Sequence, residues 1–306
     1  MTLTGRHITA GDLTPVTIRE ENIYGAPTGD SILYGDVAEG GSFTFTDTAN
    51  PYLSWRYGSR SFSHDNYVTQ QKDAGFKASL EVRDIAGWKR IIEYATGAGG
   101  TSGDPLLPTR TEMIGVRTGA NQYNERIYYG CKTDRLTIRA DAPGGVVLFD
   151  EEALASRSAP ASVGADTAWS DNSPAVQWMN GITIDGNEMY PQSFSLSIAN
   201  NLARNRVPNN GDAITGALLE GRREIELEFD VWMEDLNTIA ASINNADING
   251  DIIITLGITN AVTLTLSGCR WLSDGTNPDL IQDKQRETLR IRVGDIAVST
   301  VAVPGE

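Results

Sequence analysis

The sequence predicts a mainly β protein built from two related halves, and three observations support this prediction. Short alternations of apolar and polar residues recur along the 306 residues, separated by Gly, Asn and Asp turns, which is typical of antiparallel β-structure. Only two segments have the periodicity of an amphipathic helix. An ordered set of elements also occurs twice, at an offset of about 147 residues.

Four segments carry the clearest strand pattern. Residues 42–46, 194–198 and 262–267 alternate apolar side chains with Ser or Thr. In residues 223–230 the apolar face holds Ile225, Leu227 and Phe229, and the opposite face holds four carboxylates: Glu224, Glu226, Glu228 and Asp230. Because like charges in one row repel each other, we expect this acidic face to lie in water.

The two predicted helices each follow a strand directly. In the first, Asp84 is placed to N-cap a segment that ends at Gly97, with Trp88 and Ile91 on its apolar side. In the second, apolar residues recur at helical spacing from Trp232 to Ile243.

The repeat extends beyond the strand and helix pairs. Residues 79–84 match residues 226–231, and the helix follows in both copies. Further on, Gly130-Cys131 matches Gly268-Cys269 at the end of an alternating strand. An Arg-bearing strand comes next in each half, at 135–139 and 288–292. Four matches in the same order predict an internal duplication.

We therefore expect three regions. Residues 1–50 form a leader with a hairpin around 32–45 and assembly loops, residues 51–160 form a first domain, and residues 161–306 form a second. The boundary is expected within residues 153–165, where residues 155–162 have the Ala, Ser and Pro composition of a linker. Each domain is expected to be a β-sandwich or barrel with one packed α-helix.

Composition limits the classes of function. The formal net charge of −15 argues against a protein that grips nucleic acid, because phosphate binding needs clustered Lys and Arg. No apolar run is long enough for a membrane span, and residues 1–6 lack the apolar core of a secretory signal. We therefore expect a protein made in a cytoplasm, with no membrane partner.

Motifs that carry chemistry are weak. His7, His64, Cys131 and Cys269 have no metal-ligand spacing, and the two cysteines are expected to be reduced packing residues. The Gly-rich residues 97–103 lack the Lys and Ser or Thr of a phosphate loop. Residues 247–251 lack the ligands of a calcium loop, and nothing selects a catalytic carboxylate pair. We expect no enzyme, cofactor or metal.

Residues 193–202, followed after a polar loop by residues 221–230 and a helix, resemble the tail tube (major tail) proteins of long-tailed phages and related archaeal viruses. In that family an alternating strand ends in an Asn-rich turn, a strand that begins with Gly-Arg follows, and a helix packs against the sandwich. The resemblance covers residues 190–300 well, and residues 50–150 more weakly through the internal repeat.

The resemblance implies a structural virion protein of a siphovirus-like tail. Such subunits form rings whose inner β-barrel lines a channel for DNA ejection, and the rings stack. The family presents six tube domains in each ring, so two domains in one chain imply a homotrimer with pseudo-sixfold symmetry. The implied partners are further copies of the chain, the terminator, baseplate and tape measure proteins, and DNA in non-specific transit. Assembly in the host cytoplasm is implied.

Five carboxylates are candidates for a lumenal or water-facing acidic row: Glu81, Glu224, Glu226, Glu228 and Asp230. In the lumen such a row would repel DNA phosphates, and the outside of the tube is the alternative location. The leader and residues 97–110 and 199–220 are candidates for ring-to-ring contacts.

Two other classes of function stay open at this stage. One is a different β-rich virion protein, such as a tail terminator, baseplate or capsid decoration protein, which would not assemble into long tubes. The other is a carbohydrate-binding or hydrolytic β-sandwich, which would bind glycans through exposed Trp residues or depend on one carboxylate.

Overall fold

The computed structural model describes most of the chain: residues 15–23, 26–37, 43–45, 48–53, 67–82, 85–97, 107–119, 122–163, 176–178, 181–209, 212–232, 246–257, 261–272, 279–281 and 284–301. This part of the chain is mainly β, as predicted, and contains strands β1 to β21 and helix α1 (Ile85–Thr96). Within it, no helix has the length and hydropathy needed to cross a membrane.

Six strands of the first half close into a barrel. Their antiparallel pairings run from β1 to β2, β5, β8, β7 and β6, and back to β1. These strands are β1 (Pro15–Ile23), β2 (Ala26–Val37), β5 (Tyr67–Glu81), β6 (Arg110–Gly119), β7 (Gln122–Ala140) and β8 (Leu148–Ala155). Strands β1 and β2, from the predicted leader, are therefore part of this barrel.

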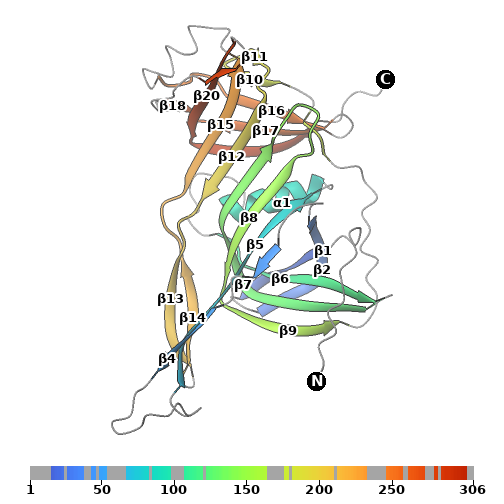
Figure 1. Cartoon of the computed structure of the whole chain (residues 1–306), viewed down its shortest axis with the longest axis vertical. Coiled ribbons are helices and arrows are strands. Elements are labelled where there is room, and N and C mark those ends of the chain that lie inside the picture. The colour runs from blue at the N-terminus through green and yellow to red at the C-terminus, as the bar shows by residue number, and fades with distance from the viewer. Residues whose placement is uncertain are drawn as a thin grey trace.

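Strand β7 is 19 residues long and pairs with four other strands. Its first part pairs with β6 on one edge and with β9 (Arg157–Val163) on the other. Its last part pairs with β8 on one edge and with β12 (Ser193–Ala199), from the second half, on the other. This one strand thus joins the two halves (Figure 1).

A long sheet runs through both halves. Its strands lie in the order β3, β5, β8, β7, β12, β15, β20 and β18, and β19 pairs with β20 next to β18. The strands not yet bounded are β3 (Phe43–Phe45), β15 (Glu224–Trp232), β18 (Arg270–Leu272), β19 (Asp279–Ile281) and β20 (Lys284–Val293). We call the sheet from β3 to β18 and β19 the long sheet.

A second sheet covers the long sheet in the second half. Its order is β11, β10, β16, β17 and β21, with bounds β10 (Ile182–Ile184), β11 (Asn187–Met189), β16 (Ile252–Leu256), β17 (Ala261–Ser267) and β21 (Asp295–Val301). Buried side chains from both sheets and from the barrel form one continuous core. Alternation explains this core, because every second residue of β12 and β15 is buried.

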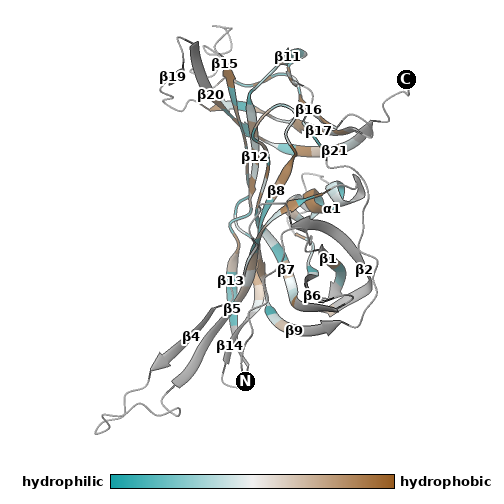
Figure 2. Ribbon diagram, turned by 45° about the vertical axis from the view of Figure 1, so that its right-hand side comes forward, coloured by the Kyte–Doolittle hydropathy of each residue, from teal (hydrophilic) through white to brown (hydrophobic). Residues whose placement is uncertain are grey.

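Helix α1 packs its predicted apolar side into the core. Trp88 is fully buried, donates its indole N–H to the Val82 carbonyl at 2.8 Å, and meets Phe149 edge-on. The helix lies between the barrel and strand β21 (Figure 2). It ends as predicted at Gly97, whose φ of 95° suits a residue without a Cβ. The second predicted helix falls on residues 233–245, outside the described residues, and Trp232 is the last residue of β15.

Two hairpins extend from one end of the long sheet (Figure 1). One joins β13 (Ala203–Asn209) to β14 (Asp212–Leu219), and the other joins β4 (Thr48–Leu53) to the first part of β5. Arg206 Nη2 lies 3.0 Å from Asp73 Oδ2, so an ion pair ties the two hairpins together. The expectation that residues 199–220 form a loop is wrong, because β13 and β14 pair along most of that segment.

Two further expectations need correction. The segment 155–162, expected to be a linker, is the end of β8 and most of β9, and both strands pair with β7. Residues 32–45 contain parts of β2 and β3, which both pair with β5, and the hairpin of this region is β1 with β2. In both places pairing with a distant strand overrides local composition.

Candidate assembly edges and channel face

The long sheet has one face turned toward the core and one face turned away from it. We call the second the open face. Its carboxylates are Glu81, Asp150, Glu152, Glu224, Glu226, Glu228 and Asp230. Its cations are Lys77, Arg135, Arg139, Arg270, Arg290 and Arg292. All five candidate acidic residues lie on this face, and three strands separate Glu81 on β5 from the other four on β15.

The acidic side chains of β15 are compensated by their neighbours. Arg290 Nε lies 2.7 Å from Glu228 Oε2, and Arg292 Nη2 lies 2.7 Å from Glu226 Oε1, because these residues are directly opposite in the β15–β20 register. Asp230 accepts hydrogen bonds from Thr288 at 2.6 Å and Ser193 at 2.8 Å. These cations and hydrogen-bond donors therefore offset the repulsion between the carboxylates of β15 that the sequence alone predicts.

The same compensation occurs in the first half. Lys77 Nζ lies 2.8 Å from Glu152 Oε2, and Arg139 Nε lies 2.6 Å from Asp150 Oδ2. The carboxylate of Asp150, helped by that of Asp141, raises the pKa of the Arg139 guanidinium through these hydrogen bonds. Strand pairing places acidic β8 between β5 and β7, so sequence spacing alone gave no signal for these ion pairs.

The junction between the halves is a regular strand pairing. In it Ser195 lies opposite Arg139 and Phe194 lies opposite Ala140, with four more pairs beyond them. At its end the Asn200 amide N–H donates to the Asp134 carbonyl at 2.8 Å. The buried side-chain amide of Asn200 donates to the carbonyls of Ala95 and Thr133, both at 2.9 Å. Asn200 thus connects helix α1, β7 and β12.

The two outermost positions of the long sheet each have one open edge among the described strands. At one end β3 pairs with β5, and at the other β18 and β19 pair with β20. No further pairing of these edges occurs within the part of the chain that the structure describes. Unpaired edges present rows of N–H and C=O groups that can accept another strand.

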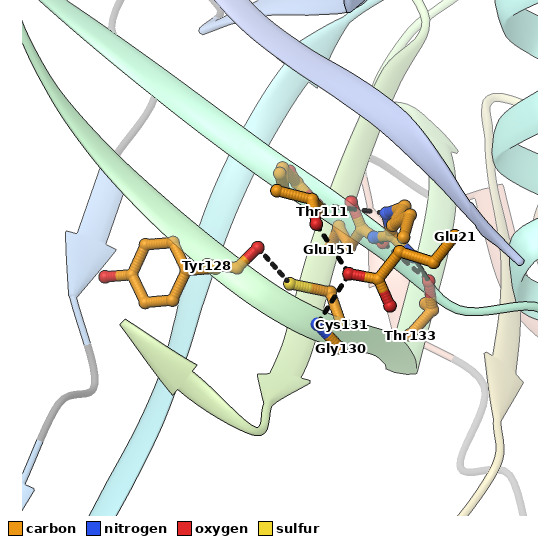
Figure 3. A network of polar contacts seen from close by, with 9 residues as sticks. Glu21, Thr111, Tyr128, Gly130, Cys131, Thr133 and Glu151 are labelled. Atoms are coloured by element: carbon orange, nitrogen blue, oxygen red, sulfur yellow. Dashed lines mark hydrogen bonds and ion pairs between the residues drawn. The ribbon is translucent and has the colours of Figure 1, made fainter. Parts of the chain in front are cut away.

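A buried ionic cluster lies inside the barrel (Figure 3). Arg110, fully buried, donates to Glu112 Oε2 at 3.0 Å and to Thr133 Oγ1 at 3.0 Å, and also forms an ion pair with Glu151. The Tyr94 ring lies 4.8 Å from the guanidinium carbon of Arg110. Burial raises the pKa of Glu112 to about 8, although Arg110 opposes this shift. We call Arg110, Glu112, Thr133 and Glu151 the ionic cluster.

Next to the ionic cluster, Glu21 of β1 joins strands that lie far apart in sequence. One of its oxygens accepts hydrogen bonds from the Thr111 hydroxyl at 2.5 Å and the Gly130 amide at 2.9 Å (Figure 3). Sequence reasoning missed this residue and the whole ionic cluster. The sequence around Arg110 and Glu112 carries no alternation that would have shown their burial.

The remaining sequence candidates do not converge on a reactive site. Cys131 and Cys269 are both buried free thiols, and burial raises the pKa of each, to about 11 for Cys269. In the described residues no group of His, Cys, Asp and Glu has metal-binding geometry, and His7 and His64 lie outside those residues. Asp247, in the segment compared with a calcium loop, forms an ion pair with Arg270, with 3.4 Å between Asp247 Oδ1 and Arg270 Nε.

Comparison with known proteins identifies a family for this chain. No curated protein matches the chain. The family model described as phage tail tube protein matches residues 25–294, which span both halves and the junction between them. This chain therefore belongs to the phage tail tube protein family and is a structural component of a virion tail.

Proposed function

We propose that three copies of this chain form a pseudo-sixfold ring, and that stacked rings form the tube through which viral DNA leaves a siphovirus-like virion. The proposal includes an internal duplication, in which each half of the chain supplies one tube domain. The observation that carries it is the order of the strands, which is the same in both halves.

The equivalence of the halves covers two sets of strands. In the long sheet the order β3, β5, β8, β7 is followed by β12, β15, β20, β18. In the covering sheets the order β9, β7, β6, β1, β2 corresponds to β21, β17, β16, β10, β11. A shared order through nine strand positions supports duplication more strongly than any sequence match.

Backbone details support the same equivalence. The Ser156 amide donates to the Tyr129 carbonyl at 2.9 Å, and 138 positions later the Gly294 amide donates to the Ser267 carbonyl at 3.0 Å. Gly130 and Gly268, also 138 positions apart, both have φ of 61°. The cysteine after each glycine is buried.

The register of β3 against β5 also supports the duplication, but with a different number of residues between corresponding positions. Phe43 lies opposite Ala78 in the first half, and Phe194 lies opposite Phe229 in the second, so these strands correspond at 151 positions. This offset also aligns the alternating residues 42–46 with 193–197. The offset of about 147 expected from the sequence differs because acidic alternating strands match each other in several registers.

The junction supplies a template for contact between copies. Within the chain, the edge of β7 pairs with β12. Under the duplication, β19 corresponds to the end of β7 and β3 corresponds to β12, so β19 of one copy pairs with β3 of the next. Arg139 lies opposite Leu148 of β8, and Asp279 lies opposite Arg286 of β20, which is 138 positions after Leu148, so Asp279 takes the place of Arg139. The internal pair Ser195 with Arg139 then translates to Thr44 opposite Asp279, and Phe194 with Ala140 translates to Phe43 opposite Leu280.

If three copies closed into a ring, every open edge of the long sheet would be paired with a strand of a neighbouring copy. Eight strand positions in each copy give about 24 strands, which at ~4.8 Å spacing make a circumference of about 115 Å before strand tilt widens it. Helix α1 and the second sheet lie on the core side of the long sheet. A barrel has more room for this second layer outside than inside, so we place the open face toward the channel.

Disulfide cross-linking tests the proposed contact. We expect the variant with Thr44→Cys and Asp279→Cys to form covalent trimers under mild oxidation, seen by non-reducing electrophoresis of the purified protein. Thr44 is exposed and the two native thiols are buried, so background cross-linking should be low. A ladder that extends to six chains would overturn the trimer, and chains that stay monomeric would overturn the edge contact.

Two controls make this experiment specific. Arg139→Cys with Ser195→Cys places the same pair at the internal junction, so it should form an intrachain disulfide with no gain in mass. Thr44→Cys with Glu188→Cys joins β3 to the exposed turn side of β11 and should not cross-link. End-on electron microscopy of the unmodified protein then distinguishes stacked tubes from single rings. The proposed terminator, baseplate and tape measure partners would bind the ends of such tubes.

A further inference from the structure

We propose that the open face of the long sheet is a charge-neutralised track, on which carboxylates hold the arginines and prevent them from gripping passing DNA. This inference rests on the proposed function, because it takes the open face to line the channel. It differs from the repulsive acidic lumen that the sequence suggests.

The charge balance of the open face is the first support. Seven carboxylates and six cations lie among the described side chains of this face, so these side chains together carry a formal charge of −1, against −15 for the whole chain. The described part of the open face is therefore close to neutral. Repulsion by net charge on this face would be weak and would be screened further by salt.

The arrangement of these charges is the second support. In Arg139, Arg290 and Arg292, one guanidinium nitrogen lies within 2.7 Å of a carboxylate oxygen. Without that carboxylate, the same nitrogen would be available to bind phosphate. Arg139 has two such partners, Asp150 and Asp141, both at 2.6 Å. Strand pairing places each partner directly opposite or diagonally adjacent, so the carboxylates need no large rearrangement to hold the arginines.

Unmasked arginines at these positions would oppose DNA movement. A guanidinium binds phosphate through parallel hydrogen bonds, and each neutralised phosphate adds affinity through counterion release. Three copies would repeat every arginine three times in a ring, and stacking would repeat each ring along the tube. A carboxylate fixed next to Arg139, Arg290 and Arg292 competes with phosphate for the guanidinium and weakens DNA binding.

Titration with DNA tests the inference without needing a complete virion. The probe is a random-sequence DNA duplex with a fluorescent label, and the readout is anisotropy with the full-length chain at 50 and 200 mM NaCl. We expect no saturable binding by the native protein. The variant Glu226→Gln with Glu228→Gln, which removes the nearest carboxylate partners of Arg290 and Arg292, should bind at least tenfold more tightly. Its affinity should fall about tenfold between the two salt concentrations, as two phosphate contacts require.

A gain of DNA binding could come from the loss of the carboxylates that hold the arginines, which we call masking, or from the change in net charge. A matched variant separates these two causes. Glu93→Gln with Glu188→Gln makes the same change in net charge at exposed sites on α1 and β11, away from the open face. It should bind DNA as poorly as the native protein. Adding Arg290→Gln and Arg292→Gln to the double glutamine variant should remove the gained binding. Circular dichroism confirms that each protein is folded before titration.

The outcomes also separate this inference from the proposed function. Gain of DNA binding in the Glu226 and Glu228 variant alone supports masking. Equal gain in the matched variant, no gain in either, or tight binding by the native protein overturns masking. If the protein forms rings and stacked tubes in any of these last three cases, the tube function stands while masking fails.

Discussion

The Thr133 hydroxyl donates a 2.6 Å hydrogen bond to Glu151 Oε1 inside the barrel. Under the proposed duplication, the positions that correspond to these two residues lie 138 residues later and hold Trp271 and Leu289, which are both buried. Trp271 packs against Phe229 there, with ring centroids 6.4 Å apart. One half thus fills this place with an ionic cluster and the other with apolar side chains.

The first prediction concerns the cation of the ionic cluster. Arg110→Met should lower the free energy of unfolding by about 3–5 kcal/mol, because it leaves the buried carboxylate of Glu151, and that of Glu112 where it is ionised, without their shared cation. Denaturant unfolding followed by circular dichroism measures the change. Arg290→Met, which breaks a half-exposed pair, is the control and should cost about 1 kcal/mol or less.

Removing all three charges of the ionic cluster should lower the free energy of unfolding less than removing Arg110 alone. A triple variant with Arg110→Met, Glu112→Leu and Glu151→Leu should regain most of the stability lost by Arg110→Met, since apolar replacement of a complete buried ionic group is often close to neutral. A triple variant that is less stable than the single one would show that the cluster supports the barrel in another way.

The second prediction is a pH dependence. The pKa of Glu112 is about 8 in the fold against an ordinary value of 4.5, so the folded state holds a proton that the unfolded state releases. This contribution to stability is fully present below about pH 4.5 and is lost as the pH rises through 8. The charged and titratable groups that interact with Glu112 are Arg110, Glu151, Tyr94 and Cys131.

Glu112→Gln removes this titration and keeps the side-chain shape. We expect the variant to lose less stability than the native protein between pH 5 and pH 8, in denaturant titrations at constant ionic strength. Parallel pH profiles for the two proteins would contradict a raised pKa at Glu112.

The third prediction tests the two faces of β15. Leu227 is fully buried, so Leu227→Asp should cost at least about 4 kcal/mol and leave little folded protein. Glu226 on the open face is more than a third exposed, so Glu226→Ala should cost about 1 kcal/mol or less. Soluble yield and melting temperature compare the two, and a normally folded Leu227→Asp protein would reverse the assigned facing.

The fourth prediction concerns the glycine before Cys269. Gly268 has φ of 61°, and a Cβ there would lie 3.5 Å from the nearest atom, so conformation and not space limits substitution. Gly268→Val should cost about 1–2 kcal/mol or more, while Gly268→Asn should cost less, because Asn tolerates this region of φ. Thermal unfolding measures both. Equal losses would indicate that contacts, and not φ, decide the cost.

Local alternation predicted much of the fold. The burial of Ile225, Leu227 and Phe229, the end of α1 at Gly97, and the burial of Cys131 and Cys269 all follow from patterns within ten residues. Periodicity and capping are properties of the local chain, so a single sequence carries them.

What the sequence did not predict depends on partners far along the chain. Residues 155–162 have the composition of a linker, but the first part of β7 offers them an edge and they become strand. The acidic residues of β15 suggest repulsion until β20 places Arg290 and Arg292 opposite them. Arg110 gave no sign of its three partners, because β6, β7 and β8 bring them together only in the barrel.

The continuous strand β7 has a consequence for synthesis on the ribosome. When the first half has emerged, the edge of β7 that β12 will cover is still bare, and the covering strand ends at Ala199, about 60 residues later. At about 5–20 residues per second, that edge stays uncovered for roughly 3–12 s. During this interval the nascent chain presents the same kind of edge that the finished protein presents at β19. If β19 of one copy pairs with β3 of the next, as proposed, the order of translation creates a short period in which a nascent chain competes with finished subunits for the same strand.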